Sequence, residues 1–237
     1  MKSLKKFCLF ATVMLIFSCS NDSGEGKIQL KLSAVNNTGT TGKSIMPSGK
    51  GNENVIFTDF KISIRDVVFK NDDDPNSNLD TDEIQFRGPY QIDLLDGSDA
   101  LTQTIGTAFV PDGLYKELRF KFHKDEDLPV TDELFDKSIF IEGTIDGTPF
   151  VFWHDTSENL DVGRGTGVQV IDGTVNFTVT FNISQFLNSF NEIDLSLAKD
   201  NNQDGVIEIF PNDEDGNQDI ADKLKENIKA TADIIDN

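Results

Sequence analysis

The stretch Val175–Ile183 constrains the fold most, because its apolar and polar residues alternate without a break. Successive side chains of a β-strand point to opposite faces, so this alternation predicts a strand with one buried and one exposed face. The buried set is Val175, Phe177, Val179, Phe181 and Ile183, and the exposed set is Asn176, Thr178, Thr180 and Asn182. A helix would place these residues on mixed faces.

Similar patterns recur along the chain, each bounded by turn residues. A phase change at Arg65-Asp66 predicts a bulge or bend in the long strand 55–69. Asp146-Gly147 and Asp172-Gly173 each separate two alternating runs, which predicts two β-hairpins. The other predicted strands cover residues 27–32, 84–95, 101–110, 118–123 and 193–197, and residues 36–54 form a long polar loop.

We therefore expect a mainly β fold, an antiparallel β-sandwich over residues 27–198. Ser184 is placed to cap a short helix near 185–190. The end of the chain differs, because its apolar residues recur at helical spacing behind Asp219 as a candidate cap. They are Ile220, Leu224, Ile228, Thr231 and Ile235, and they predict a C-terminal helix over 220–235, packed on the domain.

The N-terminal segment combines three lysines with the apolar run Phe7–Phe17 and ends in Ser18-Cys19. Eleven apolar residues are too few to span a bilayer as a helix, which needs about 20. They suit the core of an export signal. The Leu15–Cys19 stretch resembles the lipobox of bacterial lipoproteins. That resemblance implies a signal peptide over 1–18, lipidation of Cys19 and a polar tether over 19–26. An ordinary secretory signal is the alternative.

The charge and the cysteine and histidine content limit the classes of partner and metal site that this chain can have. Residues 1–18 hold three lysines and no acid, so the mature part carries 18 basic against 41 acidic residues, a formal charge of −23. Such a surface disfavours nucleic-acid binding. The only cysteines are Cys8 and Cys19, and the only histidines are His123 and His154. The mature fold therefore has no disulfide, thiolate metal site or three-histidine site.

Four segments together resemble a domain of unknown function found in Bacteroidota outer-membrane lipoproteins. They are ISIRDVVF from Ile62, PYQIDLL from Pro89, PDGLYKELRF from Pro111 and FTVTFNIS from Phe177. The resemblance implies a transthyretin-like or immunoglobulin-like sandwich and attaches no activity. The chain is also similar to copper-handling lipoproteins that partner outer-membrane transporters, but their histidine, methionine and cysteine ligands are not visible here.

The best candidate for a binding site is the acidic segment 199–219. Residues 200–208 match the first half of an EF-hand calcium loop, with oxygen donors at alternate positions and glycine at position 6. The candidate ligands are Asp200, Asn202, Asp204, Val206 through its carbonyl, and Glu208; a second spaced set is Asp213, Asp215, Asn217 and Asp219. Position 12, normally glutamate, is Pro211. The functional interpretation is one or two structural Ca²⁺ ions, and the alternative is a solvated acidic connector.

Trp153 is a candidate for an aromatic platform that binds a sugar, with core packing as the alternative. No nucleophile elbow, Walker loop or dinucleotide fingerprint is present, so an enzyme is disfavoured. We expect a lipid-anchored, non-enzymatic binding or accessory module of the outer membrane, facing the periplasm or the cell surface. It would meet the membrane through Cys19 and could contact an outer-membrane protein complex or a glycan. A carbohydrate-binding or glycan-processing protein, and an adhesin or pilus subunit, are the alternatives.

Overall fold

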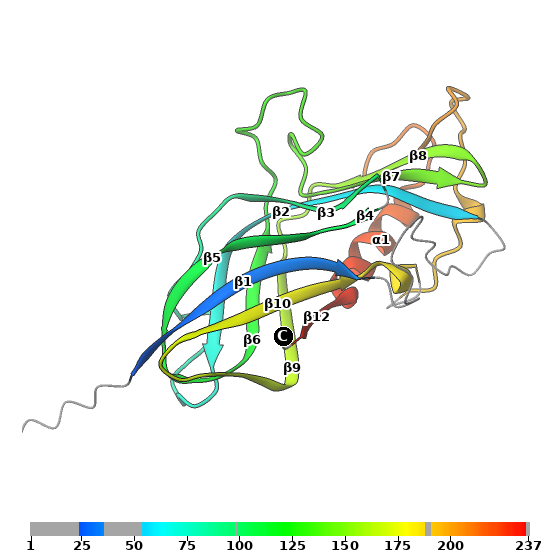
Figure 1. The fold of residues 1–237 in the computed structure, drawn as a ribbon. Coiled ribbons are helices and arrows are strands. Elements are labelled where there is room, and N and C mark those ends of the chain that lie inside the picture. Colours follow the sequence, from blue (N-terminus) through cyan, green and yellow to red (C-terminus); the bar gives the residue numbers. More distant parts are fainter. Residues whose placement is uncertain (1–23, 36–53, 98, 188–190, 236–237) are drawn as a thin grey trace, which may run out of the picture.

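The computed structural model describes residues 24–35, 54–97, 99–187 and 191–235. Two β-sheets pack face to face, with one α-helix at the C-terminal end (Figure 1), which confirms the predicted mainly β, sandwich-like fold. The elements are β1 (Glu25–Val35), β2 (Val55–Asn71), β3 (Tyr90–Asp96), β4 (Asp99–Ala100), β5 (Thr102–Pro111), β6 (Gly113–Phe122), β7 (Ile139–Ile145), β8 (Thr148–His154), β9 (Asn159–Val170), β10 (Thr174–Asn182), η1 (Ile183–Gln185), η2 (Leu195–Leu197), β11 (Ile207–Ile209), α1 (Gln218–Thr231) and β12 (Ala232–Ile235).

The smaller sheet has the order β12-β10-β1-β5, and the larger has the order β11-β8-β7-β2-β3-β4, with β6 beside β2 and β9 beside β6. The strand pairs are antiparallel except β1 with β10 and β11 with β8. The prediction of an antiparallel sandwich was therefore wrong for these two pairs. Parallel neighbours are joined by long connections, so a local sequence pattern cannot reveal them.

Strand β2 runs through both halves of the larger sheet because it bends at the predicted bulge. Val55–Ile62 pairs with β7, whereas Ile64–Asn71 pairs with β6, and the register shifts after Arg65. Asp66 adopts a φ of 53° at this bend. The predicted bulge at Arg65-Asp66 is confirmed. The strand predicted over 84–95 begins only at Tyr90, after the Gly88-Pro89 pair.

The two Asp-Gly turns have different outcomes. Asp146 and Gly147 have φ values of 50° and 85° and join β7 to β8 in the predicted hairpin. After Asp172-Gly173, however, β10 pairs with β1 and β12, while β9 pairs with β6 in the other sheet. The second hairpin prediction was wrong, because an Asp-Gly turn reverses the chain without deciding which strands then pair.

The C-terminal helix is shorter than predicted. Helix α1 ends at Thr231, and Ala232–Ile235 forms β12, an antiparallel edge strand on β10. Asn217, rather than Asp219, is the N-cap residue. The short helix predicted near 185–190 begins earlier, as a 3₁₀ helix at Ile183–Gln185, and residues 188–190 lie outside the described part. The loop predicted over 36–54 falls almost wholly on residues 36–53, which also lie outside it.

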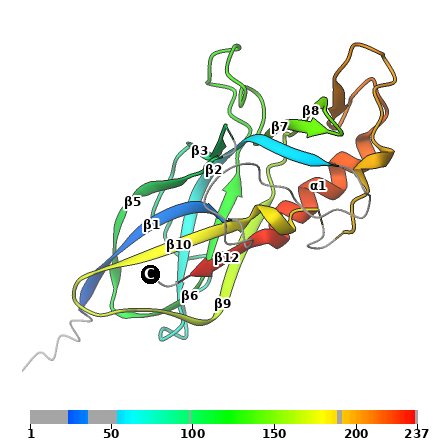
Figure 2. The ribbon, with the colours of Figure 1, turned by 45° about the vertical axis from the view of Figure 1, so that its right-hand side comes forward.

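Phenylalanines fill the space between the sheets. Phe69 meets Phe177 edge-on at 5.3 Å, Phe57 meets Phe186 at 5.7 Å, and other rings extend this cluster. Edge-to-face aromatic pairs add to the stabilisation from burial alone. Helix α1 closes one end of the sandwich (Figure 2) through Ala221, Leu224 and Ile228, each at most 2% exposed.

Candidate functional site

The first half of the acidic segment forms a ladder of side chain to backbone hydrogen bonds. The Asp200 carboxylate accepts from the N–H groups of Asp204 (3.2 Å) and Gly205 (3.0 Å). Asn202 Oδ1 accepts from the Asp204 N–H (3.0 Å), and Asp204 Oδ1 accepts from the Val206 N–H (2.9 Å). Side-chain oxygens from positions 1, 3 and 5 therefore converge on one short turn. Gly205 has a φ of 94°, a conformation that favours glycine.

Glu208 approaches the same ladder from the short strand Ile207–Ile209, which buries its two isoleucines and leaves Glu208 partly exposed. Asn202 Nδ2 lies 3.4 Å from Asp204 Oδ2 and 3.5 Å from Glu208 Oε2. Partial burial, followed by the nearby charges of Asp215 and Asp204, raises the pKa of Glu208. A cation beside these carboxylates would relieve their repulsion.

Asp215 holds the two halves of the acidic segment together. Its carboxylate is 1% exposed and accepts from the N–H groups of Asn201 (2.7 Å), Asn202 (3.0 Å) and Glu208 (2.9 Å). Burial alone would raise the pKa of Asp215, but these three donors outweigh it and lower that pKa. Asp215 therefore remains ionised and shapes the loop that carries the ladder.

Asn217 and Asp213 have similar organising roles. Asn217 accepts from the Lys199 N–H (3.1 Å) and donates to the carbonyls of Lys199 (2.9 Å) and Glu208 (2.7 Å). Asp213 accepts from the N–H groups of Asn217 (2.8 Å) and Phe210 (3.3 Å). These two side chains connect the start of the segment to its end.

Asp219 is exposed in the first turn of α1, where its charge suits the positive end of the helix dipole. In the described residues, no three side chains of His, Cys, Asp or Glu are grouped as a metal site. The ladder's own candidate donors include an amide and a backbone carbonyl. The structure thus brings Asp200, Asn202, Asp204 and Glu208 together, and Asp213, Asp215 and Asn217 brace the loop.

Trp153 packs against this segment. Its ring stacks on Phe210, with centroids 4.8 Å apart and planes 17° apart, and Lys137 Nζ lies 5.9 Å from its centre. The register places Phe210 beside Trp153, because β11 runs parallel to β8. One ring face is therefore covered, and the side chain attaches the acidic segment to the larger sheet.

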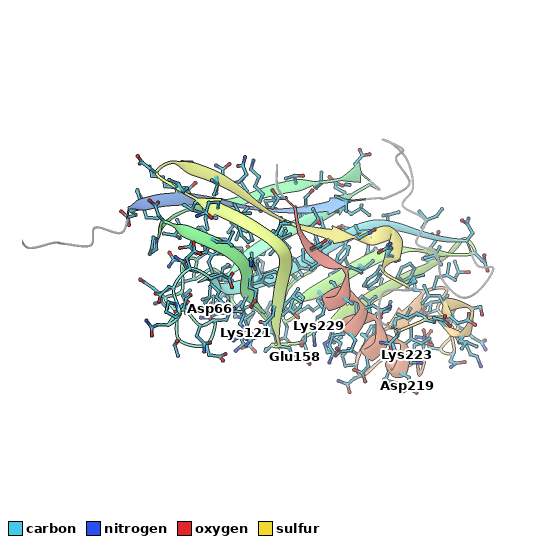
Figure 3. All side chains as sticks on the ribbon, turned by 90° about the horizontal axis from the view of Figure 1, so that it is seen from below. Asp66, Lys121, Glu158, Asp219, Lys223 and Lys229 are labelled. Carbon is cyan, nitrogen blue, oxygen red and sulfur yellow. The ribbon has the colours of Figure 1, made fainter. Side chains whose placement is uncertain are left out.

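Helix α1 is tied to the sandwich by charged groups (Figure 3). Glu158 accepts from Lys225 Nζ (2.8 Å) and Lys229 Nζ (2.5 Å), and these two hydrogen bonds lower the pKa of Glu158 to about 2. His154 is 9% exposed, and its Nε2 lies 3.6 Å from Asp222 Oδ1. Burial, and then the charge of Lys225, lower the pKa of His154.

Sequence reasoning missed a polar cleft of about 410 Å³ on the outer face of the larger sheet. Behind its floor, Gln91 donates to the carboxylate of Asp125, which is only 1% exposed (2.6 Å). Alternation marks Gln91 as outward-facing, but its contact with residues 128–134 depends on the tertiary fold. The lining residues are Lys61, Gln91, Asp93, Leu128, Thr131, Asp132, Glu133 and Leu134.

Lys61 is the cation of this cleft. It contacts Asp59 (2.8 Å) and Glu133, and these carboxylates raise the pKa of Lys61 against the opposing effect of burial. Burial also raises the pKa of Asp59 and of the nearby Glu142. The cleft therefore presents carboxylates and one ammonium group on a sheet face that also carries Trp153.

Comparisons with known proteins do not assign this chain to a family. No protein-family model matches it, and no curated protein matches it. Among solved structures, MbnP from Methylosinus trichosporium is similar at 12% identity over 74% of this chain and 81% of that chain, with a TM-score of 0.41. A likeness at that level carries no argument. Among the described residues, no helix is both long enough and apolar enough to span a membrane.

Proposed function

We propose that this protein is a lipid-anchored, non-enzymatic binding or accessory module of the bacterial outer membrane, with a transthyretin-like or immunoglobulin-like sandwich stabilised by Ca²⁺. The observation that carries the calcium proposal is the ladder formed by Asp200, Asn202 and Asp204. Their side chains occur at the alternate sequence positions of a calcium loop, and their oxygens all accept hydrogen bonds within one short turn. The Val206 carbonyl and Glu208 supply two more donors at positions 7 and 9.

Calcium at this loop would have a structural effect. Ca²⁺ takes six to eight oxygen ligands, and Pro211 offers no side-chain donor at position 12, so water completes the shell. The ion would neutralise the repulsion that raises the pKa of Glu208. It would also stiffen the acidic segment 199–219, because Phe210 in this segment stacks on Trp153 of β8 and the segment leads into α1 at the N-cap residue Asn217.

Thermal unfolding of the mature chain in EDTA, in Ca²⁺ and in Mg²⁺ tests this proposal. At a Ca²⁺ concentration about 100 times Kd, linkage gives about 2.7 kcal/mol, or a rise in Tm of about 5–10 °C for a domain of this size. The variant Asp200→Ala/Asp204→Ala should lose the rise. The matched control Asp74→Ala/Asp80→Ala removes two carboxylates from another acidic loop and should keep it. A rise equal in Mg²⁺ and Ca²⁺ would contradict a calcium-selective loop.

Lipidation is tested separately, because Cys19 lies outside the described residues. The wild-type chain should partition into the detergent phase and incorporate an alkyne-tagged fatty acid in a bacterial host. Cys19→Ala should remain aqueous and unlabelled. Equal partitioning of both proteins would contradict the anchor.

A second candidate, carbohydrate binding, is supported by the polar cleft around Lys61. Carboxylates, an amide and a hydroxyl are the groups that hold sugar hydroxyls in place. A glycan microarray would test it, with Asp93→Asn/Glu133→Gln as the cleft variant and Trp153→Phe as the test of the ring. Binding that survives the cleft variant would place the glycan elsewhere.

A further inference from the structure

Two turns and the start of β1 meet at one end of the sandwich, which we call the tip: Gly24, Pro111–Gly113 and Ile171–Gly173. The Asp112 N–H donates to the Gly24 carbonyl (2.8 Å), and the Asp172 N–H donates to Asp112 Oδ1 (3.1 Å). The Lys27 N–H donates to the Gly173 carbonyl (2.7 Å). These bonds connect both sheets and fix where the chain enters the fold.

Large apolar side chains are exposed at or beside the tip. Phe109 is 59% exposed on β5, directly opposite Lys27, and Ile171 is 68% exposed in the second turn. The ammonium group of Lys27 lies 4.7 Å from the centre of the Phe109 ring. An apolar body beside a lysine is the combination that residues at a lipid–water boundary show, with the charge reaching toward the headgroups.

The tether makes this end the part of the fold nearest to the anchor. Glu25 is six positions after Cys19, so a fully extended tether reaches about 20 Å. The route into the fold is fixed as well, because a Cβ at Gly24 would overlap the Asp112 carboxylate and one at Gly26 would overlap Val170. The tip therefore lies within about 20 Å of the lipid on Cys19, the reach of the extended tether.

The acidic segment lies at the other end of the molecule. In all three views, the orange segment around residues 200–217 and the start of β1 lie at opposite ends (Figures 1, 2 and 3). The exposed Leu197 belongs to the far end, since the nearby Lys199 is hydrogen-bonded to Asn217. The chain thus carries exposed apolar side chains both at the tip and far from it.

We infer that the tip rests in the headgroup region of the bilayer that holds the lipid on Cys19, with Phe109 and Ile171 in contact with lipid and the acidic segment facing away. This inference rests on the proposed lipid anchor. Glu25, Asp112 and Asp172 at the tip disfavour anionic headgroups, so the partner surface is zwitterionic lipid. The end of the molecule that carries the acidic segment then stays in contact with the aqueous phase.

Fluorescence quenching of the lipidated, full-length mature protein tests this orientation. The vesicles contain phosphatidylcholine and phosphatidylethanolamine, with bromine placed near the top of some acyl chains. In a Trp153→Phe background, Phe109→Trp introduces an indole at the tip, and Leu197→Trp introduces a matched exposed indole at the far end. We expect the Phe109→Trp protein to lose emission to the brominated lipid, and the Leu197→Trp protein and the wild-type protein with Trp153 to keep theirs.

Equal quenching, or no quenching, of the two introduced indoles would overturn the inference. Ile171→Trp provides a second tip position if Phe109→Trp perturbs folding, which circular dichroism checks. Mass spectrometry of the same samples separates the two proposals. An unmodified Cys19 would overturn the anchor and the orientation together, whereas acylated Cys19 with a quench pattern that ignores the tip would overturn the orientation alone.

Discussion

Gly143 shows how a single missing side chain allows two strands to approach. It lies in β7, and a Cβ there would overlap the carbonyl oxygen of Ile56 and lie 2.8 Å from the Phe150 ring. Backbone cannot move aside as a flexible side chain can. We therefore expect Gly143→Ala to lower the free energy of unfolding by about 1–3 kcal/mol, the range typical of overpacked cores.

Urea denaturation at constant pH measures this change, with Gly163→Ala as the control. Gly163 is also a strand glycine, but its added Cβ would lie 3.5 Å from Glu117 Cγ, an ordinary contact. The control should change the stability by less than about 0.5 kcal/mol. Similar values for the two variants would show that β2 and β7 are less closely packed than the structure has them.

Glu158 gives the fold a defined pH dependence. Its pKa falls from 4.5 to about 2 because Lys225 and Lys229 donate to it, so its contribution to stability is present above pH 4.5 and is lost as the pH falls toward 2. The side chain is 45% exposed, so solvent screening reduces the effect to about 1 kcal/mol. Glu158→Gln should lose this amount at pH 7 and little at pH 2.

Urea denaturation of wild type and variant at both pH values tests this prediction, since groups common to both proteins cancel. Glu83→Gln, an exposed carboxylate of the 71–83 loop, is the control and should differ little at either pH. An equal loss at both pH values would mean that Glu158 acts through packing rather than through its charge.

At the scale of elements, sequence patterns predicted the features that depend on residues close together in the chain. The bulge at Asp66 and the Asp146-Gly147 hairpin depend on neighbouring residues, and the structure has them as predicted. The strand around Phe177 also forms, but Thr178 and Thr180, predicted on its exposed face, are 3% and 4% exposed, so the prediction of one exposed face was wrong there. Strand pairing does not depend on neighbouring residues: β10 lies between β1 and β12, which are far away in sequence. The Asp172-Gly173 hairpin failed for this reason.

Strand β12 illustrates the same limit and carries a prediction. Ile234 fits the helical spacing poorly, yet it is 0% exposed in β12 opposite Val179. Removing a buried isoleucine side chain leaves a cavity, so Ile234→Ala should cost about 2–4 kcal/mol of unfolding free energy. Leu197→Ala, exposed at 63%, should cost less than about 0.5 kcal/mol. A cost below about 1 kcal/mol for Ile234→Ala would make β12 a dispensable appendage.

The candidate site also has a local part that the sequence predicts and a tertiary part that it does not predict. The spacing of Asp200, Asn202 and Asp204 is readable from the sequence because the ladder is local. The role of Asp215 in bracing the loop could not be read from the sequence, because the N–H groups that donate to its carboxylate come from 7 to 14 residues away. Neither the Trp153–Phe210 stack nor the cleft at Lys61 could be predicted, because each joins segments that only the tertiary fold brings together.

The Trp153–Phe210 stack supplies an optical signal for the acidic segment. Trp153 is the only tryptophan, and Phe210 follows Glu208 by two residues. If Ca²⁺ orders the ladder, the stack tightens and Trp153 emission should change in step with the rise in Tm. Phe210→Ala should remove the spectral change while keeping most of the Tm rise. Phe140 lies on β7 opposite Trp153 of β8, and Phe140→Leu should keep both the spectral change and the Tm rise. A Tm rise without any spectral change in wild type would show that the loop and the sheet are not coupled.

At the scale of the whole molecule, charge is the dominant feature. The formal charge is −20 because 41 acidic residues outnumber 21 basic ones, so most carboxylates remain unbalanced even where lysines such as Lys225 pair with Glu158. Like charges on a compact surface repel one another, and they repel less when salt shortens the Debye length from about 30 Å at 0.01 M to about 8 Å at 0.15 M. The folded state should therefore gain stability from salt alone.

We expect NaCl raised from about 0.01 M to about 0.15 M in EDTA to increase Tm by about 2–4 °C, which corresponds to about 1 kcal/mol in a domain of this size. Differential scanning calorimetry at pH 7 measures it. The Asp200→Ala/Asp204→Ala variant should gain nearly as much, because screening acts on the whole surface and not on one loop. A gain confined to the wild type would instead mean that sodium occupies the ladder. A calcium effect specific to the loop must then appear on top of this increase, at matched ionic strength.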